Sequence, residues 1–86
     1  RQGTRFVMLI DDKPGVFAQV TKLFAQENAN VENIAVYHTD RGSEVVVKAT
    51  GEVAVDKMTK ILQDAGFNIT NVVQTTTDGK TVVWLK

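Results

Sequence analysis

The turn at residues 11–17, Asp-Asp-Lys-Pro-Gly-Val-Phe, carries the side chains best suited to binding chemistry. If a helix begins here, its first backbone N–H groups lack partners and form a ready anion site. The carboxylate of Asp12 suits an ammonium group, although the same side chain is also a good helix cap. Gly15 has no side chain to keep a ligand from the backbone, although it also permits tight helix packing. The turn therefore has the chemistry to hold a zwitterion such as an amino acid.

Residues for catalysis or metal binding are sparse in the rest of the chain. There is no cysteine, which excludes a disulfide framework, a thiolate nucleophile and a thiolate metal site. His38 is the single histidine, and a lone histidine at a strand end is far more often a surface group than a metal ligand. Asp11 and Asp12 are adjacent on a turn, so their carboxylates need not converge as a catalytic pair. We predict no enzymatic activity, no metal and no cofactor.

The candidate turn needs a strand before it and a helix after it, and the apolar pattern provides both. Residues 5–10 form a short apolar run rich in strand formers. Pro14 fits the first helical turn, where a missing N–H costs nothing. Apolar residues then recur at the spacing of one helix face, at Val16, Val20, Leu23 and Phe24.

The rest of the chain continues the alternation of strands and helices. Gly66 stands where a left-handed residue ends a second helix, and Asp78-Gly79 is a strong tight-turn signal. The predicted elements are strands at residues 31–38 and 44–50, a helix at 54–65, and strands at 67–76 and 81–85.

This order predicts an α+β fold, a ferredoxin-like βαββαβ sandwich. Right-handed strand–helix–strand units place both helices on one face of a four-stranded antiparallel sheet. Residues 81–85 then add an extra C-terminal strand, where Trp84 either packs against the sheet or forms a dimer contact. The second face of the sheet is left uncovered, and an uncovered face or edge strand favours dimerisation.

The composition narrows the class of partner. A chain of 86 residues is one domain, 1–86, and its small core makes self-association a natural source of stability. Ten basic residues balance ten acidic ones without a run of either sign, so nucleic acid and anionic membranes are not expected partners. No apolar stretch approaches the roughly 20 residues of a membrane span, and no secretory h-region is visible. We expect a cytoplasmic domain that belongs to a longer protein.

Other functions of ferredoxin-like domains make demands that this chain does not meet. A metal-transfer domain needs a Cys-x-x-Cys turn. An RNA-recognition sheet needs aromatic residues on its central strands, and residues 44–50 contain none. A phosphate-hydrolysing enzyme of the acylphosphatase type needs an arginine in its first turn, where Lys13 is the only cation.

Residues 12–17, the helical stripe that follows them and the pair Asn30-Val31 together resemble the ACT-domain signature. The resemblance implies a regulatory domain that forms a homodimer and binds an amino acid, where the first strand–helix turn of one copy faces its partner. The chain is especially similar to the ACT modules that follow paired CBS domains in bacterial regulatory proteins.

The resemblance also implies roles for individual residues. Asp12 matches the polar turn position of the family, and Gly15 matches the glycine that lets the ligand approach the backbone. The amides of Val16 and Phe17 would face a ligand carboxylate, so the implied site runs from Asp11 to Phe17.

Two positions leave the identity of the ligand and the extent of the site undecided. Serine-regulated relatives have a histidine two residues before the polar turn position, where this chain has Ile10. Loss of that donor favours an apolar amino acid, or no ligand at all, and a ligand-free ACT-like assembly module is the alternative function. Asn30 matches the interfacial asparagine of the family, and ordinary turn chemistry explains it equally well.

Overall fold

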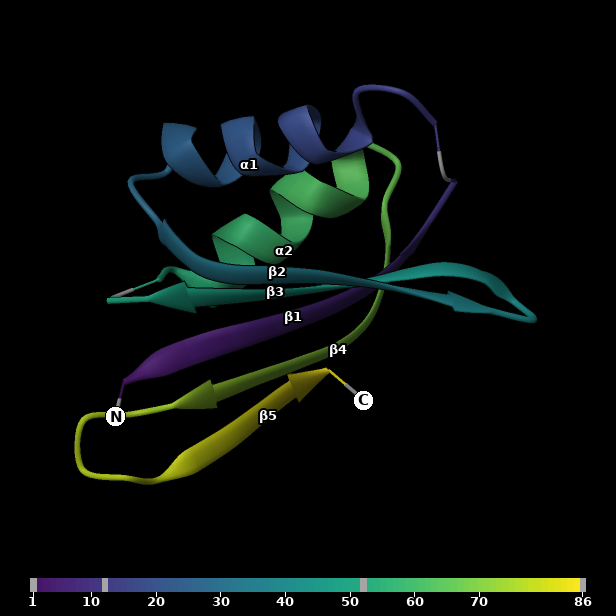
Figure 1. The fold of residues 1–86 in the computed structure, drawn as a ribbon. Coiled ribbons are helices and arrows are strands. Elements are labelled where there is room, and N and C mark those ends of the chain that lie inside the picture. The colour runs from purple at the N-terminus through teal and green to yellow at the C-terminus, as the bar shows by residue number, and fades with distance from the viewer. Residues whose placement is uncertain (1, 12, 52, 86) are drawn as a thin grey trace.

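The computed structural model describes residues 2–11, 13–51 and 53–85 as a five-stranded sheet with both helices on one face (Figure 1). The elements are β1 (Gly3–Ile10), α1 (Val16–Gln26), β2 (Asn30–Thr39), β3 (Gly42–Thr50), α2 (Val55–Asp64), β4 (Asn68–Thr75) and β5 (Thr81–Leu85). Every element predicted from the sequence is present, and the boundaries differ by only a few residues.

The strands lie in the order β2-β3-β1-β4-β5, and each neighbouring pair is antiparallel. The first four strands have the arrangement of the βαββαβ fold, with β1 and β3 at the centre. Strand β5 pairs with β4 and extends the sheet by one strand, as predicted. The ferredoxin-like prediction is therefore confirmed.

Period-two alternation along the central strands separates the core from the second face of the sheet. In β1 the residues at even positions, Thr4, Phe6 and Met8, are buried beneath the helices. Phe24 from α1 meets Phe6 edge-to-face, with ring centroids 5.3 Å apart and an interplanar angle of 77°. Leu62 from α2 is fully buried in the same cluster. This single core fixes both helices on the sheet, and hence the turns that precede and follow them.

Both helices end in a left-handed residue. In α2 the N–H of Gly66 (φ 97°) bonds to the Gln63 carbonyl at 2.9 Å, and the Phe67 N–H bonds to the Leu62 carbonyl at 3.1 Å. This pair of bonds is a Schellman motif, which confirms the role predicted for Gly66. Asn28 (φ 57°) ends α1 with the corresponding bonds to Ala25 and Phe24, at 3.0 Å each.

The start of α1 differs from the prediction. Pro14 lies in the turn before the helix and not within its first helical turn, since α1 begins at Val16. Gly15 is the N-cap residue, with φ 86°, a conformation that glycine adopts without strain. Asp12, proposed from the sequence as a cap, lies outside the described residues. Across the described ranges, neither helix has the length and apolar character needed to span a membrane.

Candidate functional site

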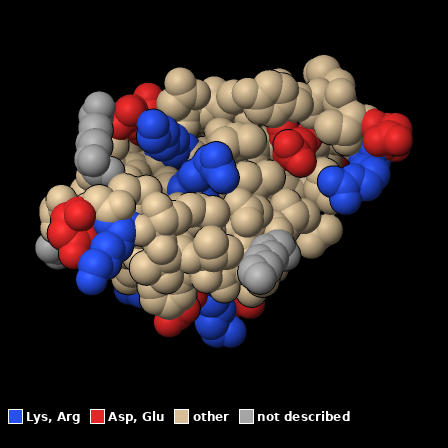
Figure 2. All heavy atoms as spheres, turned by 90° about the horizontal axis from the view of Figure 1, so that it is seen from below, with Lys and Arg blue, Asp and Glu red and all other residues tan. Residues whose placement is uncertain are grey.

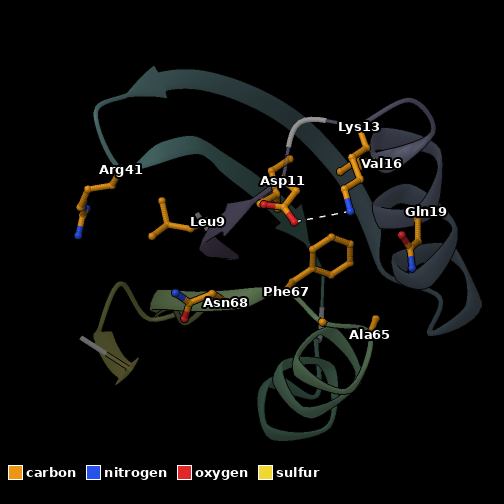
Figure 3. A pocket seen from close by; sticks show the side chains of 11 residues that line it. Leu9, Asp11, Lys13, Val16, Gln19, Arg41, Ala65, Phe67 and Asn68 are labelled. Carbon is orange, nitrogen blue, oxygen red and sulfur yellow. Dashed lines mark ion pairs between the residues drawn. The ribbon is translucent and has the colours of Figure 1, made fainter.

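A hollow of about 460 Å³ opens at the end of the sheet where β1 leads into α1 and α2 leads into β4 (Figure 3). The pairing of β1 with β4 brings these two turns together, because the last residues of β1 lie beside the first residues of β4. The β2–β3 hairpin reaches the same end of the sheet, since Ile10 is opposite Ser43. Three separate segments of the chain therefore form the walls.

Charged groups of both signs line the opening. Lys13 Nζ lies 3.7 Å from Asp11 Oδ2, and both side chains are largely exposed. Arg41 comes from the hairpin, and Figure 3 shows its side chain apart from the Asp11–Lys13 pair, with Leu9 between them. Exposed ion pairs of this kind contribute about 0–1 kcal/mol, so the Asp11–Lys13 pair is readily exchanged for contacts with a ligand.

The inner wall of the hollow is apolar. It is formed by Ile10 and Val16 from one turn and by Ala65 and Phe67 from the other. Phe67 is only 8% exposed, and Figure 3 shows its ring directed toward the Asp11–Lys13 pair. The Schellman motif at Gly66 reverses the chain here, so it sets the position of this ring. The hollow thus combines a charged rim with an apolar wall.

The structure brings together only part of the site predicted from the sequence. Asp11 and Val16 line the hollow, whereas Asp12 lies outside the described residues. Gly15 caps α1 beside the hollow, and Phe17 is 47% exposed and does not line it.

Asn30 lies at the opposite end of the sheet from the hollow. Its Nδ2 donates to Thr50 Oγ1 at 3.0 Å, and Thr50 is paired with Gly3 at the start of β1. The length of β1 from Gly3 to Ile10 spans about 23 Å. Asn30 therefore cannot contact a ligand in the hollow of its own copy, and its place in the sequence-predicted site depends on a partner.

The sequence did not indicate the parts of the hollow that are formed by the α2–β4 turn and by the β2–β3 hairpin. Arg41, Gln19, Phe67 and Asn68 line the hollow, and none of them was assigned to the site. The signal available for Phe67 was indirect: Gly66 marks a helix end, and in a βαββαβ fold the strand after α2 starts beside the end of β1. No comparable signal distinguished Arg41 from other turn residues.

A second hollow, of about 340 Å³, lies between the end of α1 and the start of α2. Its charged groups satisfy each other, since Lys57 Nζ lies 2.9 Å from Glu27 Oε1. The side-chain hydrogen bond and the charge of Glu27 raise the pKa of Lys57. Apolar Val53, Ala54 and Met58 also line this hollow, but its two charged groups are already paired with each other and it is smaller than the first, so it is the weaker candidate.

Metal ligands do not cluster in the described part of the chain, where no three His, Asp or Glu residues could hold an ion together. His38 is exposed, with Nδ1 at 3.1 Å from Ser43 Oγ. This position agrees with its interpretation as a surface residue.

Comparison with known families decides the class. Residues 6–64 match the model of the AHAS small subunit-like ACT domain, and this range includes most of β1, the candidate turn, α1, the β2–β3 hairpin and α2. The chain belongs to this ACT-domain family. Seventy residues are also 33% identical to the acetolactate synthase small subunit of Mycobacterium bovis and to the putative acetolactate synthase small subunit of Mycobacterium tuberculosis. The match covers 78% of this chain and 41% of each relative, so this ACT domain spans less than half the length of these proteins.

Proposed function

We propose that this ACT domain is a non-catalytic regulatory module that binds an amino acid in the hollow beside α1. The observation that carries the proposal is the composition of the hollow: carboxylate and cationic groups at its rim, and apolar side chains along its wall. A free amino acid presents the complementary set, namely an ammonium group, a carboxylate and a side chain. The ACT family relationship supports the same class of ligand.

Each part of the hollow has a role in this proposal. Asp11 receives the ammonium group, while Lys13 and the Phe17 amide at the start of α1 receive the carboxylate. The Val16 amide, which was also expected to face the ligand, already donates to the Lys13 carbonyl at 3.2 Å. Gly15 keeps the approach to the Phe17 amide open, since nothing lies within 4 Å of a Cβ built there. Asp12, the next residue in the sequence of this turn, is proposed as a second carboxylate for the ammonium group.

The wall of the hollow defines the preferred ligand. Ile10 and Phe67 offer apolar surface without a hydrogen-bond donor, so an apolar amino acid loses less on binding than a serine-like one. The described hollow is large enough for a small amino acid at about 460 Å³. Because the charged groups at its rim are exposed, affinity comes from the combination of contacts and not from one buried ion pair.

The domain acts in this proposal as a homodimer, in which a ligand shifts the relative orientation of the two copies. Such a shift occurs only if the ligand binds one arrangement more tightly than the other. Asn30 would contribute across the dimer, because it lies far from the hollow of its own copy. We expect the dimer to control a linked or associated catalytic unit in the cytoplasm, without binding nucleic acid or membrane.

The relatives favour acetolactate synthase as the enzyme with which this domain works. Both are named as small subunits of that enzyme, at 33% identity, although this chain spans only 41% of their length. A parent protein with CBS domains, suggested by the sequence resemblance, is the second candidate, and it has no counterpart among these relatives.

A thermal-shift screen of the twenty amino acids tests the ligand proposal. A ligand at about 100 times its Kd stabilises the domain by roughly 2.7 kcal/mol, which raises the Tm by roughly 10–20 °C at this chain length. We expect one or a few apolar amino acids to produce this shift, and Asp11→Asn to weaken their binding by up to about fivefold in calorimetry.

Asp64→Asn is the matched control. Asp64 is also an exposed carboxylate paired with a lysine, at 3.6 Å from Lys60 Nζ, but it does not line the hollow. If no amino acid shifts the Tm while the protein is dimeric, the alternative function, a ligand-free assembly module, replaces the proposal.

A further inference from the structure

Another hollow, of about 320 Å³, lies on the face of the sheet that carries no helix. It is at the end of the sheet where β1 begins, whereas the hollow beside α1 is at the end where β1 stops. Two cationic and two hydroxyl side chains line it, from four different strands: Arg5, Lys48, Thr75 and Thr81. Figure 2 shows this face, with Lys and Arg side chains next to each other within a broad surface of uncharged residues.

Strand pairing brings the two cations together. Thr4 and Phe6 are buried beneath the helices, so Arg5 between them points to the other face of the sheet. Lys48 is directly opposite Arg5 in the β1–β3 pair, and the Cβ atoms of such a pair are about 4.5–5.5 Å apart. Both charged groups can therefore reach one anionic group between them. Like charges directly opposite each other destabilise a sheet, so an anion that contacts both removes a repulsion.

The protein itself neutralises these two cations only in part. Lys48 Nζ lies 4.0 Å from Glu32 Oε1, which is a long separation for an ion pair, and the Lys48 side chain is 56% exposed. Arg5 is exposed and forms no ion pair with another described residue. The hollow therefore keeps an excess of positive charge.

Gly3 and two threonines form the rest of the hollow. Gly3 is opposite Thr75 in β4, and Thr75 is in turn opposite Thr81 in β5. Because Gly3 has no side chain, the space beside Arg5 on this face stays open. The hydroxyl groups of Thr75 and Thr81 have no hydrogen-bond partner among the described residues. The hollow thus combines a guanidinium, an ammonium and two hydroxyl groups that are free to donate.

We propose that this hollow binds the phosphoryl group of a small molecule, either free phosphate or a phosphate monoester. A phosphoryl group carries about −1.5 to −2 charges at pH 7 and has three oxygens that accept strong hydrogen bonds. It can engage Arg5 through two parallel hydrogen bonds, Lys48 as a point charge, and the threonine hydroxyls with its remaining oxygen. A carboxylate has a single charge and two oxygens, so it leaves part of this donor set unused.

The lining also limits the rest of the ligand. A volume of about 320 Å³ is at the lower end of the range for small-molecule sites. None of the described lining residues is aromatic, so the base of a nucleotide would find no ring on which to stack. The ligand is therefore phosphate or a compact ester such as a sugar phosphate. Because both cations are exposed, we expect a dissociation constant on the order of 1 mM that rises with salt.

The inference goes beyond the proposed amino-acid site and does not rest on it, because the two hollows share no lining residue. NMR titration of the isotope-labelled 86-residue chain tests it, with the ionic strength held constant by sodium chloride. Inorganic phosphate and glucose 6-phosphate should each produce saturable shifts of the amide signals of residues 3–5, 48, 75 and 81. The tighter of these two probes identifies the source of the phosphoryl group. Sodium acetate should bind at least about fivefold more weakly.

Charge-removing variants locate the anion. Arg5→Gln and Lys48→Gln should each weaken phosphate binding about fivefold, as expected for one exposed charge pair, and the double variant should show no saturable shift. Lys22→Gln, at an exposed position of α1 outside the hollow, is the matched control and should leave the dissociation constant unchanged. Arg5→Gln and Lys48→Gln each remove a like-charge repulsion, so their Tm in phosphate-free buffer should be no lower than that of the original chain. This measurement separates lost binding from lost structure.

Three results would overturn the inference. Shifts that rise linearly with phosphate and are spread over the whole surface show that the anion only screens charge. Acetate that binds as tightly as phosphate identifies a carboxylate site in place of a phosphoryl site. Saturable shifts that neither charge variant weakens, or that are confined to residues 13–17, place the anion elsewhere on the domain.

Discussion

Gly15 is the residue on which the geometry of the α1 start depends. Its φ of 86° is left-handed, and a Cβ built there has nothing within 4 Å, so a substitution is disfavoured by the backbone and not by a clash. We expect Gly15→Ala to lower the free energy of unfolding by about 1–2 kcal/mol. Gly15→Asn should lose less, because asparagine tolerates this conformation. Urea unfolding of both variants checks the difference, and equal losses would contradict the assigned cause.

Asp78 is an exposed residue whose pKa is lowered by hydrogen bonds from its neighbours. The Thr76 hydroxyl donates to its carboxylate, and this bond, followed by that from the Lys80 N–H, lowers the pKa of Asp78 below its ordinary value of 3.8. A carboxyl group whose pKa is lower in the folded state than in the unfolded state stabilises the fold at pH values above its unfolded-state pKa. This stabilisation is lost as the pH falls through the folded-state pKa. Thr76→Val should raise the pKa of Asp78 in an NMR titration. Thr77→Val is the neighbouring control, and an unchanged pKa in both would contradict the role of Thr76.

Helix α1 is held on the sheet by its middle and its end, where Val20 and Phe24 are buried, and not by its first turn. Phe24 is fully buried against Phe6, whereas Phe17, two turns earlier, is 47% exposed. Phe24→Ala should therefore cost about 3–5 kcal/mol of unfolding free energy, as expected for a large core residue. Phe17→Ala should cost less than about 1 kcal/mol, which makes it the matched control. Similar losses in denaturant unfolding would mean that Phe17 is covered in solution, for example by a second copy.

The elements could be predicted because their local signals agree with their tertiary environment. The apolar stripe of α1, the Val45-Val46-Val47 run of β3 and the left-handed Gly66 each favour the state in which they are found. Pro14 was placed within the helix because proline is compatible with the first turn of a helix as well as with the turn before it.

The candidate site was less predictable because it is not local. The residues of the β1–α1 turn were found from their own chemistry, and Asp11 and Val16 do line the hollow. Phe67 and Arg41 join them only through strand pairing, since β4 and the β2–β3 hairpin meet the end of β1 in space and not in sequence. When strand pairing brings two side chains together, the residue spacing within either segment alone does not indicate that they will meet.

At the scale of the whole molecule, β5 is an addition to a sheet that is already complete. It pairs only with β4, where Asn71 Nδ2 donates to the Leu85 carbonyl at 2.9 Å and Trp84 Nε1 donates to Gln74 Oε1 at 3.1 Å. Removal of residues 77–86 should leave a cooperatively folded βαββαβ domain, less stable by about 1–3 kcal/mol. Circular dichroism during thermal unfolding measures both properties. A broad, non-cooperative transition would show instead that β5 is required for the core.

The strand order also determines when this domain can fold during its synthesis. Of the five strands of this sheet, β1 emerges from the ribosome before the others, yet it lies at the centre, between β3 and β4. Its two edges stay unpaired until residues 42–50 and 68–75 have been made. Before contacts so distant in sequence can form, the chain between them must close into a large loop, and this entropy cost slows folding. The sheet therefore cannot be assembled strand by strand in sequence order. While residues 11–67 are being made, the chain therefore exposes a strand with the sequence Arg-Phe-Val-Met-Leu-Ile, an apolar segment of the kind that chaperones bind.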